Sequence, residues 1–293
     1  ISYMNVVVWP IRMLIEMYSM AMRAMAAAER VFEIIDLEPE VKDCLPAAPL
    51  TITEGKIDFE QVWFRYRDDC PWIARDLTFS IPGGATVALV GETGAGKTTL
   101  SHLIARFYDV QRGGISIDGI DIAHCAQEEL HRAMAIVLQE GYLFSGTVMD
   151  NLRFRAEHLS ESQVIELARR LGVHDAIRAL SAGYHTEVKE GGTSLSLGQR
   201  QIISLTRALA ADPKILMLDE PTSSMDVYTE RIIRRALERL VRDRTTIIIA
   251  HRLSTIKNAD RILVVGKGGI VEQGTHHTLL KKKGKYAQLV SAN

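Results

Sequence analysis

The sequence has little excess charge of either sign, few cysteines and no long uninterrupted hydrophobic run. Its formal net charge is −1 over 293 residues, which argues against a nucleic-acid-binding surface as the main function, so any anion site must be local. The three cysteines lack paired metal-ligand spacing, and we expect reduced thiols in a cytosolic setting. The uncharged stretch 1–11 is shorter than the ~20 apolar residues that span a bilayer, and we expect no signal peptide.

A cluster of prolines divides the chain into two parts. Pro39, Pro46 and Pro49 fall in a segment without helical or strand periodicity, so we expect a linker near residues 38–52. Before it, the Met- and Ala-rich stretch 12–37 is typical of a long helix. Periodicity alone leaves open whether this helix packs within the protein or continues a membrane helix. The predicted division is into residues 1–51 and residues 52–293.

A glycine-rich stretch follows the apolar run 86–90 and precedes residues 100–107, whose apolar positions recur at helical spacing. It satisfies the pattern G-x-x-x-x-G-K-[ST] in the strand, loop and helix context that a phosphate-binding loop requires. Its glycines let backbone N–H groups turn around phosphate oxygens, its lysine adds a point charge, and Thr98 offers a hydroxyl to Mg²⁺. The alternative is a glycine-rich turn with a surface lysine. The predicted phosphate-binding residues are Gly91, Glu92, Thr93, Gly94, Ala95, Gly96, Lys97, Thr98 and Thr99.

The region before this loop is predicted to be β-structure. Residues 56–66 and 77–81 alternate as strands do and suggest a small antiparallel sheet, and residues 114–119 are typical of a hairpin. Tyr66 ends the first strand. Its ring is available for stacking on a nucleotide base, and the alternative is an ordinary core or edge-strand tyrosine.

Two single polar residues follow further predicted strands, at the edge where open α/β sheets bind their ligands. Gln139 follows the strand 135–138 and either reaches a metal ion and water or is a solvated loop residue. His251 follows the strand 245–250 and is either structural or a phosphate contact.

A pair of carboxylates occupies a comparable position. The continuous apolar run 214–218 predicts a strand buried on both faces, which ends in Asp219 and Glu220. Two adjacent carboxylates there are costly without a cation. The pair fits Mg²⁺ binding by Asp219 and activation of water by Glu220. Helix-like runs over residues 161–181 indicate a helical insertion in this α/β core.

Ser196 and Gly198 lie at the start of a predicted helix that runs to about residue 211. A hydroxyl and free N–H groups at a helix start can hold an anion, and a simple N-cap is the alternative.

In their order, these motifs resemble the nucleotide-binding domain of ABC transporters over roughly residues 52–293. In that family the loop 91–99 is the Walker A motif, Gln139 is the Q-loop glutamine and residues 195–199 are the signature motif, which adds Gln199 to the nucleotide-binding residues. The common signature has Gly-Gly before Gln, whereas Leu197 precedes Gly198 here. This variant is compatible with a phosphate contact made by the backbone and Ser196.

The same resemblance assigns the remaining roles. Asp219 closes the Walker B motif, and Glu220 is the general base. Asp226 lies in the D-loop, 223–226. His251 is the switch histidine, and Tyr66 looks like the A-loop aromatic that stacks on adenine.

The implied fold is an α/β P-loop NTPase (RecA-like) core with an N-terminal antiparallel β-subdomain and an inserted α-helical subdomain at about residues 141–204. The implied ligands are ATP and Mg²⁺. The family also implies a head-to-tail homo- or heterodimer in which Ser196 of one copy completes the ATP site that holds Lys97 of the other. Closure of the two copies would then be coupled to hydrolysis.

Residues 139–148 resemble the exporter-type Q-loop region, which forms part of the groove for a coupling helix of the membrane domain. Residues 9–37 look like the cytoplasmic end of the last transmembrane helix and the link out of it. The expected function is therefore ATP hydrolysis by an exporter-type transporter at the cytoplasmic face of the cell membrane, with a fused transmembrane domain and no nucleic-acid partner. A soluble ABC-type ATPase is the alternative, and it predicts a coiled-coil insertion or a tandem ATPase domain. A domain that senses ATP without hydrolysing it is disfavoured by Glu220 and His251.

Overall fold

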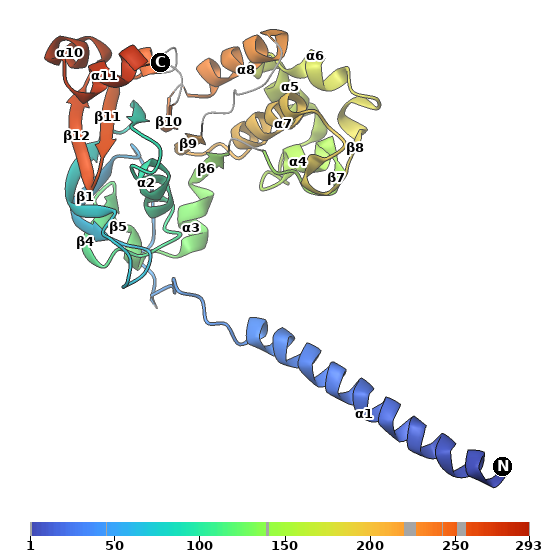
Figure 1. Cartoon of the computed structure of the whole chain (residues 1–293). Helices are drawn as coiled ribbons and strands as arrows, with labels where there is room; N and C mark the ends of the chain where they lie inside the picture. Colours follow the sequence, from blue (N-terminus) through green and yellow to red (C-terminus); the bar gives the residue numbers. More distant parts are fainter. Residues whose placement is uncertain are drawn as a thin grey trace. The chain divides into compact units, whose positions relative to one another are not determined.

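The computed structural model divides the chain into two compact units, Ile1–Lys42 and Asp43–Asn293. Figure 1 shows the elements of both units in chain order. The residues that the structure describes are 2–44, 46–138, 141–219, 227–241, 243–250 and 256–292.

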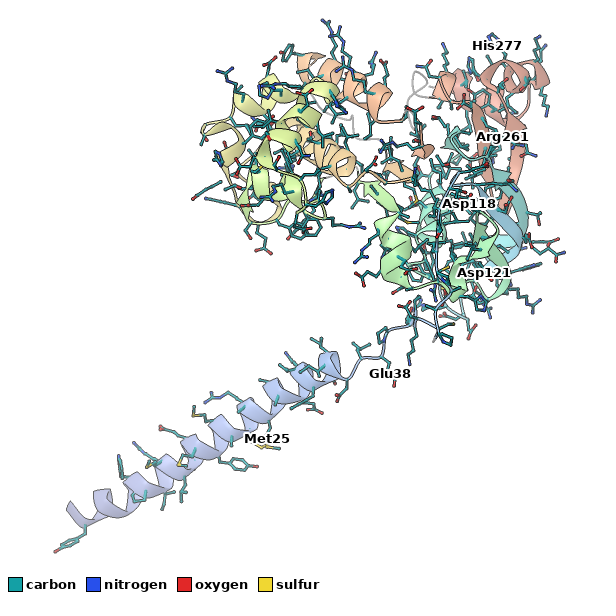
Figure 2. The ribbon with its side chains drawn as sticks, turned by 180° about the vertical axis from the view of Figure 1, so that it is seen from behind. Met25, Glu38, Asp118, Asp121, Arg261 and His277 are labelled. Carbon is teal, nitrogen blue, oxygen red and sulfur yellow. The ribbon has the colours of Figure 1, made fainter. Side chains whose placement is uncertain are left out.

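The first unit is built on one long helix, α1 (Ser2–Ile35), which contains Pro10. The helix predicted over residues 12–37 is confirmed, but it begins earlier than the sequence suggested. Large apolar side chains along it, among them Trp9, Leu14 and Met25, are exposed, and Figure 2 labels Met25. No helix in the described part of the chain combines the length and the apolar character needed to cross a membrane.

The second unit contains two main sheets. An antiparallel sheet has the strand order β2-β1-β4-β5, and a six-stranded sheet has the order β12-β11-β3-β10-β9-β6. All neighbours in the larger sheet are parallel except β11 and β12. The strands are β1 (Ile57–Phe64), β2 (Ala74–Ile81), β3 (Thr86–Val90), β4 (Arg112–Ile117), β5 (Ile120–Asp121), β6 (Met134–Val137), β9 (Ile215–Asp219), β10 (Thr245–Ile249), β11 (Arg261–Gly266) and β12 (Gly269–Gly274), and a separate pair is formed by β7 (Gly146–Thr147) and β8 (Glu187–Val188).

Helices cover the larger sheet and form the insertion between β6 and β9 (Figure 1). Within the insertion, α7 contacts α4, α5 and α6, and it also contacts β6 and α8. On the described residues, the α-helices of the second unit are α2 (Lys97–Ile104), α3 (Gln127–Arg132), α4 (Val148–Arg153), α5 (Glu161–Leu171), α6 (His174–Arg178), α7 (Leu197–Ala210), α8 (Val227–Leu240), α10 (His276–Lys282) and α11 (Lys285–Ala292).

The larger sheet is buried between two hydrophobic cores. Successive side chains of a strand point to opposite faces, and β3 shows the result: Val87 and Leu89 pack with the antiparallel sheet, whereas Ala88 and Val90 pack with the helical insertion. The strands β9 and β10 alternate between the same two cores. Burial on both faces explains why these strands carry apolar residues at consecutive positions in the sequence.

The predicted α/β architecture, with its antiparallel β-subdomain and helical insertion, is confirmed. The predicted strands 56–66, 77–81, 135–138, 214–218 and 245–250 each correspond to an observed strand within a few residues. The three cysteines are free thiols, and of these Cys125 is buried.

Asp118 fastens the start of the second unit to its first sheet. Its carboxylate accepts hydrogen bonds from the backbone N–H groups of residues 53–56, at 2.8–3.1 Å. Figure 2 labels Asp118 in the sheet region. Burial acts to raise the pKa of Asp118, but donation from these four amides outweighs it, so the pKa lies below its ordinary value. The charged carboxylate therefore stabilises the fold.

We expect Asp118→Asn to lower the free energy of unfolding by about 2 kcal/mol at neutral pH, because hydrogen bonds to a charged acceptor are lost. The folded-state pKa is lowered, so this stabilisation is present above the unfolded pKa of about 3.9 and is lost as the pH falls through the folded value. Urea denaturation of both proteins should therefore give curves that converge below about pH 4. Asp76→Asn is the matched control, since Asp76 is exposed and has φ of 49° against 50° at Asp118. An equal loss from both substitutions would contradict the assignment.

Candidate functional site

The site lies where neighbouring parallel strands of the larger sheet end. The strand β3 leads into the loop 91–96 and then α2, and β10 and β9 are the next two strands of the sheet. Ile249 of β10 pairs with Leu89 on one side and Asp219 on the other. The sheet therefore brings Asp219 to the same edge as the glycine-rich loop, as the sequence predicted.

The loop has the backbone conformation that its glycines permit. Gly94 and Gly96 have φ values of 79° and 100°, a region that side chains other than glycine rarely occupy. Gly96 is the N-cap residue of α2 and provides no side-chain cap. The first N–H groups of α2 therefore face the loop without a capping side chain, which suits an anionic ligand.

Lys97 is the first residue of α2, and its side chain lies inside this loop. The residue is only 6% exposed. Its Nζ donates to the carbonyl oxygens of Gly91 and Glu92, at 2.8 and 3.0 Å. Burial lowers the pKa of the Lys97 ammonium, and the Asp219 carboxylate partly offsets this effect. Only neutral carbonyl groups hold this desolvated ammonium, so an anion that enters the loop would stabilise its charge.

A cavity of about 310 Å³ lies over the loop. It brings together most of the predicted phosphate-binding residues and the predicted metal ligand from β9. The residues that line it are Ile73, Thr93, Gly94, Gly96, Lys97, Thr98, Thr99, Asp219 and Ile249.

Thr98 and Asp219 are the predicted Mg²⁺ ligands on described residues, and both line this cavity and a smaller one of about 40 Å³ beside it. A hydroxyl and a carboxylate are the hard oxygen ligands that Mg²⁺ prefers, with water and phosphate oxygens completing the shell. The donor set therefore fits the ion.

Tyr66 lies just beyond β1 and is hydrogen-bonded to α2, the helix that follows the loop. Its Oη is 3.0 Å from Oγ1 of Thr99. Its ring meets the rings of Phe64 and Tyr108 edge-on, with centroids 5.1 and 4.9 Å away. The side chain is 40% exposed, so Tyr66 is not a core tyrosine.

Ser196, Gly198 and Gln199 begin α7 and do not line the cavity over the loop. Ser196 and Gln199 form a capping box in which the serine Oγ accepts from the Gln199 N–H and the glutamine Oε1 accepts from the Ser196 N–H. A Cβ at Gly198 would lie 2.3 Å from Cγ2 of Thr229, so close packing of α7 on α8 requires glycine there. Both predicted alternatives for Ser196 are compatible with this geometry, because Ser196 caps the helix and is exposed.

Four predicted site residues, Gln139, Glu220, Asp226 and His251, lie outside the described residues. Their predicted roles remain predictions.

Among the residues near the loop that the sequence did not predict are Ile73 and Lys285. Ile73 lines the cavity, and its Cγ2 would be 3.0 Å from a Cβ at Gly96. Lys285, at the start of α11, pairs with Glu92 of the loop with Nζ and Oε1 3.4 Å apart. Both come from segments distant in the chain and belong to no motif, so no sequence signal marks them.

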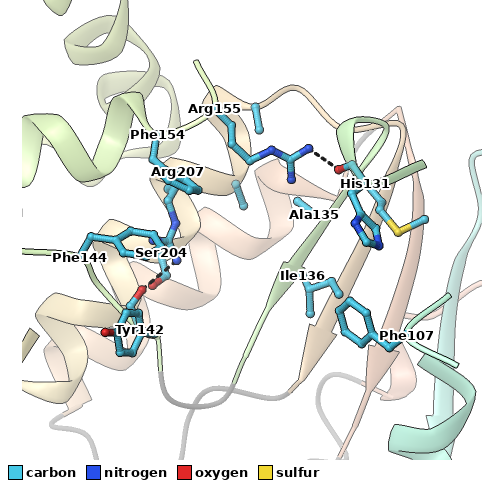
Figure 3. A pocket seen from close by; sticks show the side chains of 13 residues that line it. Phe107, His131, Ala135, Ile136, Tyr142, Phe144, Phe154, Arg155, Ser204 and Arg207 are labelled. Carbon is cyan, nitrogen blue, oxygen red and sulfur yellow. Dashed lines mark hydrogen bonds between the residues drawn. The ribbon is translucent and has the colours of Figure 1, made fainter. Parts of the chain in front are cut away.

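A second hollow, the aromatic groove, lies between the larger sheet and the helical insertion (Figure 3). Its volume is about 350 Å³, and four aromatic side chains in it, Phe107, Tyr142, Phe144 and Phe154, are 42–47% exposed. Arg207 crosses it, donating from Nη2 to the Tyr142 carbonyl at 2.9 Å.

Comparison with known proteins places this geometry in a family. Residues 74–223 match the family model described as ABC transporter. The chain is 44% identical over 292 residues to a fatty acid ABC transporter ATP-binding/permease protein of Mycobacterium bovis, covering 100% of this chain and 46% of that protein. It is 46% identical over 280 residues to an ATP-dependent lipid A-core flippase of Syntrophus aciditrophicus, covering 96% of this chain and 46% of that protein.

The fold is likewise similar to a solved structure, that of a bacterial Atm1-family ABC exporter with ATP bound, with a TM-score of 0.84 and 39% identity over 92% of this chain and 47% of the other. The chain thus spans about half the length of the relatives it matches. With the phosphate-binding loop, the cavity and the family model in agreement, the chain belongs to the ABC transporter family, whose ATP-binding domains hydrolyse ATP.

Proposed function

We propose that this chain is the MgATP-hydrolysing motor of an exporter-type ABC transporter. The observation that carries the proposal is the cavity in which Lys97, Thr98 and Asp219 meet beside free helix N–H groups. Such a cavity provides an anion cradle and a cation ligand set at one place. The transporter relatives favour this function over that of a soluble ABC-type ATPase.

Each residue near the triphosphate then has a defined task. Lys97 and the loop amides hold the phosphates, and Tyr66 stacks on the base. Thr98 and Asp219, with Gln139, would hold Mg²⁺, which would supply positive charge against the charge that develops on the phosphates. Glu220 accepts the proton of the attacking water and His251 steadies the terminal phosphate.

We further propose that the site is completed by a second copy or a homologous domain. Ser196, Gly198 and Gln199 do not line the cavity of their own chain, which supports the proposal that another chain supplies them. We place Asp226 with these three residues because it lies in the D-loop motif, 223–226. Shared sites of this kind couple dimer closure to hydrolysis.

Complementation between two inactive variants tests this arrangement. Lys97→Ala inactivates the cradle, and Ser196→Asp keeps a good N-cap residue while placing negative charge against the phosphates. Each variant alone is expected to release little phosphate from MgATP. In an equal mixture, half of the dimers pair one variant with the other and restore one normal site, so phosphate release should recover to about a quarter of the wild-type rate.

Ser160→Asp is the matched control, because Ser160 caps α5 in a capping box of the same kind. This control should hydrolyse ATP normally. If the mixture of the two variants is no more active than either alone, the shared site is wrong, whereas an active Ser196→Asp protein on its own would remove Ser196 from the site.

We also propose a fused transmembrane domain as partner, with this chain on the cytoplasmic face of the membrane. The two relatives compared above by sequence are about twice as long, and their descriptions contain permease or flippase. Residues 1–51 would be the end of the last transmembrane helix and the linker, and residues 52–293 the ATPase domain. The exposed aromatic rings of the aromatic groove suit the apolar face of a coupling helix.

A further inference from the structure

Tyr66 and Thr99 connect two parts of the nucleotide site that sequence motifs treat separately. Thr99 lies in the first turn of α2 and lines the cavity over the phosphate-binding loop. Tyr66 stands beyond the end of β1 with its Oη 3.0 Å from the Thr99 Oγ1. The hydroxyl of the residue proposed to stack on the base therefore touches a residue proposed to hold the phosphates.

The direction of this hydrogen bond is set by what binds beside it. Either hydroxyl can donate to the other in the structure as it stands. Phosphate oxygens only accept, so a bound phosphate draws the proton of the Thr99 hydroxyl toward itself. Tyr66 must then donate to Thr99, and a chain of two donated bonds runs from the phenol to the phosphate, in which each bond strengthens the other.

The surroundings hold the phenol in this position. Phe64 and Tyr108 contact the Tyr66 ring edge-on, at interplanar angles of 82°. The Thr99 hydroxyl fixes the far end of the ring, and Thr99 itself is 7% exposed and held by the helix. A change of the Tyr66 χ1 angle, which would carry the ring away, would break the hydroxyl contact.

We propose that the Tyr66 hydroxyl is a positioning group for the phosphates: it orients the Thr99 hydroxyl toward a phosphate oxygen and at the same time fixes the ring against which the base stacks. This proposal rests on the proposed function, since it takes ATP as the ligand of the cavity. It assigns Tyr66 a role that stacking alone does not require, because phenylalanine would stack equally well.

Isothermal titration calorimetry with two probes separates the two roles. ATP carries base and phosphates, whereas inorganic tripolyphosphate carries phosphates alone. We expect Tyr66→Phe to weaken binding of both probes by about fivefold, the size of one net hydrogen bond. Tyr66→Ala should weaken ATP further and tripolyphosphate no more than Tyr66→Phe does. Tyr108→Phe keeps the neighbouring ring that contacts Tyr66 and removes only its hydroxyl, so it is the control, with both affinities unchanged.

A double-mutant cycle identifies the route. In a Thr99→Ala background, Tyr66→Phe should have no further effect on tripolyphosphate binding if the hydroxyl acts through Thr99. The proposal is overturned if Tyr66→Phe binds both probes as the wild type does, or if it weakens ATP alone. Failure of the wild-type chain to bind either probe would instead refute the proposed function.

Discussion

Replacement of Glu220 by glutamine is expected to lower ATP turnover by about 10²–10⁴-fold, the range that a positioned general base contributes. Glutamine has nearly the shape of glutamate but accepts no proton from the attacking water. ATP should still bind, because the phosphate contacts come from the loop and from Thr98 rather than from this carboxylate. Phosphate release at saturating MgATP and calorimetric ATP binding measure the two effects separately.

The same variant should accumulate in the ATP-bound, paired state, since closure is retained and hydrolysis is slow. Size-exclusion chromatography with MgATP would show a larger species than without it. Glu238→Gln is the control, because Glu238 is an exposed glutamate of α8. Wild-type turnover in Glu220→Gln would exclude this residue as the general base.

Removal of the Lys97 charge is the second large effect that we expect. Lys97→Ala deletes charge-assisted contacts that are individually worth about 1.5–3 kcal/mol, so ATP affinity should fall by at least about tenfold. The loss should be similar for tripolyphosphate, because the ammonium is held at the phosphate-binding loop and not at the base. Calorimetry with both probes measures it.

Lys97 also donates to two loop carbonyls, so the variant must be checked for a change in the loop itself. Urea denaturation without nucleotide supplies this check. Lys281→Ala, on the exposed surface of α10, is the matched loss of charge and should bind ATP normally. Unchanged ATP affinity in Lys97→Ala would refute the assignment of the whole site.

Much of the fold could be predicted because the burial of each strand leaves a pattern of apolar and polar residues in the sequence. The strands β9 and β10 are buried on both faces and carry apolar residues at consecutive positions, whereas apolar and polar residues alternate in β1. The strands β11 and β12 and the helices α10 and α11 were not predicted. Two of these, β12 and α10, are short and amphipathic, and contacts with other elements stabilise them. For example, the carboxylate of Glu272 in β12 accepts hydrogen bonds from the N–H groups at the start of α11.

The site divides in the same way. A contiguous motif with its own backbone geometry predicted the loop, and the end of a buried strand predicted Asp219. The positions of Ile73 and Lys285 depend on how distant segments meet, which local spacing does not encode. The Tyr66 to Thr99 hydrogen bond joins residues 33 positions apart, and only the folded chain shows it.

The two-sided burial of β3 has a consequence for how the loop tolerates change. The strand that delivers residues 91–96 has no face turned to solvent, so a misfit on either side displaces the same short peptide. The helical insertion and the antiparallel sheet therefore pack against the same strand. A small displacement of either one shifts β3 and the loop that binds the phosphates, although neither touches the phosphates itself.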